Sequence, residues 1–111
     1  MLREAESLPT PQQADAWVAL GRVRLEQRQI DEAQRWLFTA AGFWEKFDPG
    51  NVFGGEAAFW YAQTLVAKGQ PSLARRQLLR ATQLLGASTW PIHRELLRRG
   101  QAELAGKSPA K

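Results

Sequence analysis

Cysteine is absent from this sequence of 111 residues, and histidine, methionine and tyrosine each occur once. A chain without cysteine forms no disulfide framework, no thiolate nucleophile and no cysteine-based metal site. The sequence also lacks any apolar run near the roughly 18 residues that span a bilayer. Its first residues show no basic segment followed by an apolar one, so no signal peptide is visible, and we expect a cytoplasmic protein without a membrane partner.

A recognisable catalytic or metal-binding pattern is also missing. His93 is the single histidine, and the serines occupy turn, cap or tail positions, so no nucleophile stands beside a base. The carboxylates are scattered without the tight spacing of metal ligands, and the glycines do not follow phosphate-loop spacing. We predict that the protein is not an enzyme, binds no cofactor or metal, and carries His93 at its surface or at an interface.

Apolar and aromatic residues are plentiful, at 44% and 10% of the chain, and five of the aromatic residues are tryptophans. This composition predicts a packed core. Charge is distributed unevenly: residues 1–56 contain 6 basic and 9 acidic side chains, whereas residues 57–111 contain 9 basic and 2 acidic ones. The second half is therefore a candidate surface for an acidic partner.

A helix–turn–helix pattern over residues 17–40 recurs over residues 58–81. Small residues fall on small ones: Gly21 corresponds to Ala62 and Ala33 to Ala74. Small side chains are needed where two antiparallel helices cross closely. A period in this range is typical of stacked helical repeats, in which each unit buries its apolar face against its neighbours.

The first copy resembles the tetratricopeptide repeat in Trp17-x-x-Leu20-Gly21 and Ala33-x-x-x-Leu37-x-x-Ala40. Arg24 stands where that repeat has tyrosine, and the period of 41 exceeds the usual length of about 34. The resemblance implies an all-α fold of antiparallel helical hairpins, stacked as a short TPR-like solenoid of about five helices. Two repeats and a C-terminal capping helix make up this solenoid.

The expected domain boundaries follow from helix start and stop signals. We expect an N-terminal arm over residues 1–10, a helical domain over residues 11–105 and a disordered tail over residues 106–111. The helical domain divides into a hairpin at 11–47, a second hairpin at 55–86 and a capping helix at 90–105.

Local signals predict how individual helices begin. Thr10 and Gln13 form a capping box around Pro11. Asp31 is predicted to cap the second helix, and Gly54 and Gly55 are predicted to belong to the connector before the third. Apolar spacing predicts that the following side chains point into the core: Leu20, Phe47, Leu73, Leu84, Ile92, Leu96 and Leu97.

The resemblance implies that the first helix of each hairpin lines a groove for a protein or peptide. Chaperone-binding members of the family clamp a terminal carboxylate there with lysine and asparagine, but Val18 and Arg22 stand at those positions, so we do not carry the clamp over. The alternative is that these residues are ordinary surface and core edge. The predicted groove residues are Asp15, Val18, Arg22, Glu26, Glu56, Phe59 and Gln63.

Two further groups have a functional and a structural interpretation. Trp36 and Phe43 lie off the main apolar stripe, one heptad apart, and are candidates for self-association as a homodimer, although core packing is the alternative. Four arginines in pairs one turn apart are candidates for contacts with phosphate or another anion, or form a solvated face. These are Arg76, Arg80, Arg94 and Arg98.

The sequence thus favours a non-catalytic protein-interaction module, either a small scaffold or part of a regulatory protein, that binds a protein or peptide and self-associates. The alternative function is a nucleic-acid-binding helical domain that uses the basic second half.

Overall fold

The computed structural model describes residues 9–106, which form five α-helices and no strand. This confirms the predicted all-α class. The proposed arm, except Pro9 and Thr10, and the proposed tail, except Gly106, lie outside the described residues. The helices are α2 (Pro11–Glu26), α3 (Ile30–Phe47), α4 (Val52–Ala67), α5 (Pro71–Leu85) and α6 (Pro91–Leu104).

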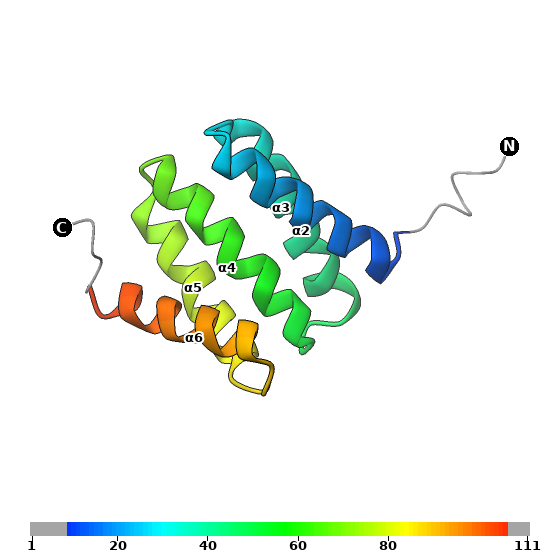
Figure 1. Ribbon diagram of the computed structural model, residues 1–111, viewed down its shortest axis with the longest axis vertical. Coiled ribbons are helices and arrows are strands. Elements are labelled where there is room, and N and C mark those ends of the chain that lie inside the picture. The colour runs from blue at the N-terminus through cyan, green and yellow to red at the C-terminus, as the bar shows by residue number, and fades with distance from the viewer. Residues whose placement is uncertain (1–8, 107–111) are drawn as a thin grey trace, which may run out of the picture.

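Consecutive helices pack against each other, so the chain forms a stack of hairpins (Figure 1). The first hairpin is α2 and α3, the second is α4 and α5, and α6 packs on α5. Helix α4 also contacts α2 and α6, whereas the backbones of α3 and α5 do not approach each other closely within residues 9–106. The helices α2, α4 and α6 therefore lie side by side along one face of the stack, which we call the inner face.

The period of the sequence is also a period of the structure. Pro11 and Val52 begin α2 and α4, and Ile30 and Pro71 begin α3 and α5, so both helices of the second hairpin start one full period after their counterparts. The first helix and the turn after it therefore occupy the same length of chain in both hairpins, whereas α3, with 18 residues, is longer than α5, with 15.

Helix starts follow the local signals with two exceptions. The capping box between Thr10 and Gln13 is present, as predicted. Asp31 does not cap α3: Gln29 precedes the helix, and Asp31 lies in the first turn, where its charge favours the positive end of the helix dipole. Helix α4 begins at Val52 rather than Gly55, because the Asn51 side chain accepts a hydrogen bond from the Phe53 amide.

Glycines inside helices mark the closest crossings. A methyl group on Gly21 would lie 2.4 Å from Cγ of Leu37, and one on Gly54 would lie 2.9 Å from Cβ of Trp44. The prediction that Gly54 and Gly55 form a connector is therefore wrong. They are buried helical residues, and a side chain at either position would collide with the neighbouring helices.

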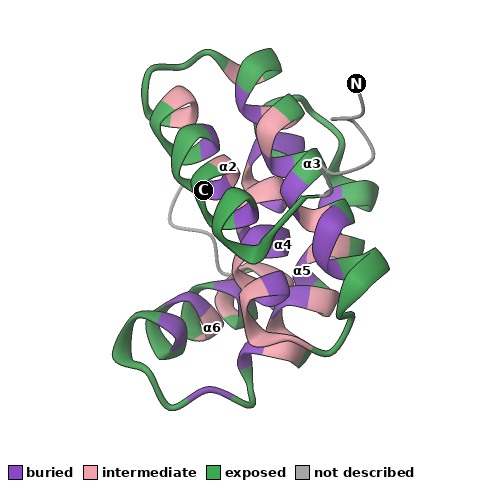
Figure 2. Ribbon diagram, turned by 90° about the vertical axis from the view of Figure 1, so that its right-hand side faces the viewer, coloured by how far each residue is buried: buried purple, intermediate pink, exposed green. Residues whose placement is uncertain are grey.

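The core consists of two clusters, one within the first hairpin and α4, the other between α4, α5 and α6. Ala33, Ala40, Ala62 and Ala74 are all buried at the helix crossings, as the repeat predicted. Helices α2, α3, α5 and α6 each alternate between buried and exposed positions along their turns, with one side in the core, whereas α4 is buried or half-buried from Val52 to Leu65 (Figure 2).

Four side chains predicted to be in the core are exposed instead. They lie on sides of their helices that no other described helix covers, and Leu73 and Ile92 are in the first turns of α5 and α6. A helical stripe predicts a shared face but not how far the neighbouring helix reaches along it. The four are Leu20, Phe47, Leu73 and Ile92.

Candidate functional site: the inner face

The centre of the inner face is a tryptophan with two arginines. The guanidinium of Arg22, from α2, lies 4.6 Å from the ring centroid of Trp60 on α4. The guanidinium of Arg99, from α6, lies 5.5 Å from the same ring and 5.1 Å from Phe59. Neither arginine forms an ion pair within the part of the chain that the structure describes. A guanidinium stacked on an aromatic ring keeps its N–H groups available for a planar acceptor such as a carboxylate.

At one end of this trio, three titratable side chains from three helices lie near one another. Nε2 of His93 (α6) is 3.6 Å from a carboxylate oxygen of Glu56 (α4), which is long for a hydrogen bond. Burial raises the pKa of Glu56, and nearby Asp15 of α2 acts in the same direction, while His93 and Arg22 oppose the rise. Burial also raises the pKa of Asp15. The Glu56 carboxylate thus sits where its charged form is poorly solvated, whereas Asp15 is exposed at the edge of this group.

His93 is not a surface residue, so the surface half of that prediction is wrong. It is 1% exposed, its ring stacks on Trp90 at 5.2 Å, and Phe53 meets it edge-on at 5.5 Å. Nδ1 lies 2.8 Å from the Ser88 hydroxyl, whose oxygen also accepts the Trp90 amide. With the hydroxyl donating to Nδ1, the imidazole proton lies on Nε2, facing Glu56. Ser88 and His93 therefore tie the α5–α6 connector to α4.

At the other end, α4 and α6 are joined by a polar contact. The Gln63 side-chain amide donates to both carboxylate oxygens of Glu103, each at 3.1 Å. The inner face therefore carries acids with a histidine at one end, arginines in the middle, and an amide with an acid at the other end.

The predicted groove residues are only partly at this face. Val18 and Phe59 are buried in the core, so assigning them to a groove is wrong. Val18 belongs to the core cluster of the first hairpin and α4, and Phe59 to the cluster between α4, α5 and α6. The other five lie on or beside the inner face, and Arg22 and Glu26 also line a hollow of 230 Å³ along α2.

The self-association surface predicted from Trp36 and Phe43 is not exposed as a patch. Phe43 is 7% exposed and packs edge-on against Trp17 and Trp44. Trp36 is half-buried. Phe43 therefore belongs to the core of the first hairpin, and core packing is the correct alternative for this residue.

An apolar stripe is exposed on α2 instead. Ala16, Leu20 and Val23 are all exposed. Their counterparts in the second hairpin lie on the side of α4 that packs toward α3: Ala57 is buried in the core of the first hairpin, and Tyr61 contacts Phe38. The exposed side of α2 thus corresponds to the side of α4 that packs against α3. On α2, no described helix covers this side.

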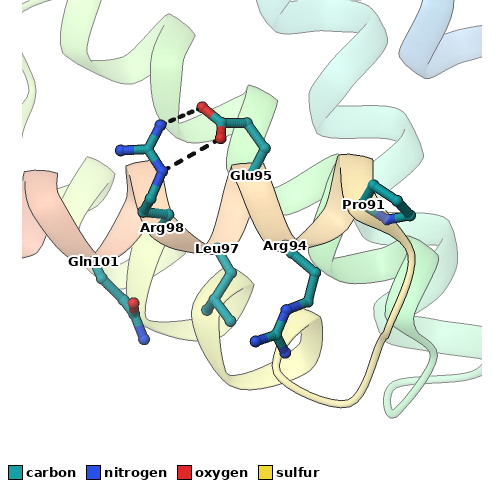
Figure 3. Close-up of a pocket in the computed structure, with 6 residues that line it drawn as sticks. All are labelled: Pro91, Arg94, Glu95, Leu97, Arg98 and Gln101. Atoms are coloured by element: carbon teal, nitrogen blue, oxygen red, sulfur yellow. Dashed lines mark hydrogen bonds and ion pairs between the residues drawn. The ribbon is translucent and has the colours of Figure 1, made fainter.

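Two of the four candidate anion-binding arginines already have partners. Arg80 donates to the Pro49 carbonyl at 3.3 Å. Arg98 pairs with Glu95 on its own helix, and Figure 3 shows its side chain turned toward Glu95 while Arg94 points away. Arg76 and Arg94 are exposed. Within the protein, one arginine of each pair is therefore engaged and the other is exposed.

Sequence reasoning did not include Trp60, Ser88, Arg99 or Glu103 in a site. The repeat gave no guide to α6, because the sequence after Leu85 aligns with neither copy. The sequence signal for the orientation of α6 is Gly100. It is buried against Thr82, as Gly21 is against Leu37, so its side of α6 faces the stack.

Within residues 9–106 no three acidic or histidine side chains form a group that would hold a metal ion, and no helix there is both long and apolar enough to cross a membrane. No family model, curated protein or solved structure matches this chain. The site is therefore interpreted from its own chemistry.

Proposed function

We propose that this protein is a TPR-like protein-interaction module that binds an acidic peptide segment across its inner face. The observation that supports this most is the convergence of Arg22 and Arg99, from two different helices, on Trp60 of a third. The aromatic ring holds both side chains in place, so little side-chain entropy remains to be lost on binding. A carboxylate of the ligand meets two guanidiniums, and its apolar neighbours meet the indole.

The polar contacts at the two ends of the face define the length of ligand that fits. The carboxylates of Glu56 at one end and Glu103 at the other end present acceptors for a basic or amide side chain. We therefore expect an extended or helical segment with an acidic residue at its centre and a basic or amide residue beside it. Shape and charge pattern together give such a face its specificity.

A random peptide display library selected on the purified protein tests this proposal. We expect selected peptides enriched in Asp or Glu next to an apolar residue. Their affinity should fall about tenfold or more in the variant Arg22→Gln/Arg99→Gln, since charge-assisted hydrogen bonds are lost. The matched control is Arg76→Gln/Arg94→Gln, which removes the same charge from exposed positions of α5 and α6. Peptides that bind both variants equally well would rule out the inner face.

Binding to heparin or RNA distinguishes the alternative function. A nucleic-acid-binding protein loses affinity steeply with salt, in proportion to the phosphates contacted. Strong, salt-sensitive retention that the Arg76→Gln/Arg94→Gln variant abolishes would favour nucleic-acid binding over peptide recognition.

Self-association is a second candidate, and its supporting observation is the exposed stripe of Ala16, Leu20 and Val23. We propose that a second copy covers it, because its counterpart on α4 is covered by a helix. Light scattering should show a dimer that becomes a monomer in Val23→Glu. A monomer in the unmodified protein at high concentration would exclude this arrangement.

A further inference from the structure

An aromatic pocket lies at the edge of the first hairpin, away from the Arg22–Trp60–Arg99 trio. It is enclosed by the start of α2, the end of α3 and the connector into α4, and has a volume of 530 Å³. Pockets of this size hold small ligands or single side chains of a partner. Its walls include Asp15, Phe43, Trp44, Phe47, Asp48 and Phe53.

Four aromatic rings line the pocket. Phe43 meets Trp44 edge-on with ring centroids 5.0 Å apart, and Phe47 lies 5.1 Å from Phe43. Phe53, on α4, lies 6.3 Å from Trp44 on α3, across the connector between the two hairpins. Phe47 is 50% exposed, although a large apolar side chain gains from burial. Rings of this kind attract a cation through the negative charge of their faces.

The charged residues of the wall are both acidic. Asp15 and Asp48 contribute carboxylates, and no lysine or arginine is among the residues within 9–106 that line the pocket. Asp48 also ends α3, so the negative end of that helix dipole lies at the same place. The Asp48 carboxylate accepts a hydrogen bond from Asn51, which fixes its position.

A cation already stacks on the outermost ring. Nζ of Lys46 lies 5.3 Å from the centroid of Phe47. This contact shows that Phe47 is placed where an ammonium group reaches it. Lys46 is on the same helix and does not line the pocket, so among the described residues this ammonium group stays outside the interior.

We propose that the aromatic pocket binds an organic cation with a methylated ammonium head, about the size of choline. The head lies among the rings near Asp15 and Asp48, and an apolar stem extends past Phe47. The same chemistry is found in a free small molecule and in a methylated lysine side chain of a protein. This inference does not depend on the inner-face function, because its residues other than Asp15 are distinct.

Choline and its neutral isostere 3,3-dimethylbutan-1-ol test the role of charge directly. We expect titration followed by amide and indole NMR shifts to place choline at Phe47, Phe53 and Trp44, with affinity at least about tenfold above that of the alcohol. Equal binding of the two compounds, or no shifts at these residues with tens of millimolar choline, would overturn the proposal.

Substitutions in the pocket test which residues bind the cation. Asp15→Asn and Phe47→Ala should each weaken choline binding about fivefold or more, because they remove a charge or a ring face. Phe38→Ala is the matched control, since Phe38 is an exposed ring on the same helix that contacts Tyr61 outside the pocket. Thermal melts must show each variant folded. A Phe38→Ala variant as weak as Phe47→Ala would contradict the assignment.

A peptide with one trimethyl-lysine identifies the source of the cation. Tighter binding of that peptide than of choline, with shifts at the same residues, assigns the pocket to a protein side chain. The reverse order assigns it to a free small molecule. Binding of the peptide that survives Arg22→Gln/Arg99→Gln would show that the pocket acts independently of the inner face.

Discussion

Arg28 adopts the same left-handed backbone conformation as Gly69, its counterpart in the second hairpin. Their φ angles are 64° and 74°, and Arg28 is the only described residue other than glycine with positive φ. In both turns the amide of the following residue donates a hydrogen bond back to the first helix of the hairpin. Gln29 donates to the Arg24 carbonyl, and Gln70 donates to the Leu65 carbonyl. The two hairpins therefore use one turn geometry, which ends the first helix in each, but only the second has the residue that suits it.

Replacing Arg28 by glycine should stabilise the protein. A non-glycine residue in this conformation costs about 1–2 kcal/mol, part of which the greater freedom of glycine in the unfolded chain offsets. We therefore expect Arg28→Gly to raise the free energy of unfolding by about 0.5–1 kcal/mol, measured by urea denaturation. Arg28→Ala is the control for the lost charge and should change little. The reciprocal Gly69→Ala should destabilise, and an unchanged stability there would refute the strain argument.

Two helical glycines should respond in opposite directions to the same substitution. Added at Gly21, a methyl group lies 2.4 Å from Cγ of Leu37, whereas at Gly42 it meets nothing within 4 Å. Gly21→Ala should therefore cost about 1–3 kcal/mol through overpacking, and Gly42→Ala should gain up to about 1 kcal/mol from helix propensity. Thermal melts of the two variants provide the comparison. Equal shifts of both would mean that Leu37 moves aside without cost.

The repeat predicted both hairpins because its signals are local or periodic. Thr10, Pro71 and Pro91 mark helix starts within a few positions of sequence, and the alanines at the crossings recur at a fixed interval. Gly54 and Gly55 misled the prediction, because a glycine pair in a loop and a glycine pair at a helix crossing look identical until the neighbouring helix is known.

The candidate site was less predictable because its contacts are long-range. Arg99 reaches Trp60, and Glu103 reaches Gln63, across the whole of α5 and both of its connectors. Nothing in the spacing of these residues indicates which side of α6 faces α4. His93 was misplaced for the same reason, since its burial depends on Phe53, Glu56 and Trp90.

Glu56 should make the stability depend on pH in a defined direction. Because burial raises its pKa, the folded state holds the proton more tightly than the unfolded state. The contribution of Glu56 to stability is then fully present below its ordinary pKa of 4.5 and is lost as the pH rises through the raised pKa of the folded state. Glu56→Gln removes the charge, so we expect a higher melting temperature than wild type at pH 7 and little difference near pH 4.

Melts at a series of pH values test this expectation. Glu45→Gln, at an exposed position of α3, is the control for the change in net charge. A Glu56→Gln variant that is less stable than wild type at pH 7 would mean that attraction to His93 and Arg22 outweighs the cost of burying the carboxylate.

The Ser88 hydroxyl should be the most sensitive polar group in the α5–α6 connector. It is 9% exposed, contacts Nδ1 of His93 at 2.8 Å and accepts the Trp90 amide at 3.1 Å. Ser88→Ala leaves a buried imidazole nitrogen and an amide without partners, which should cost about 1–3 kcal/mol of unfolding free energy. Ser72→Ala, at an exposed position in the first turn of α5, should change stability by less than about 0.5 kcal/mol. Urea denaturation of both variants at pH 7 measures the difference. A loss for Ser88→Ala no larger than that for Ser72→Ala would show that water replaces the hydroxyl and that the other contacts of α6 with α4 and α5 hold it in place.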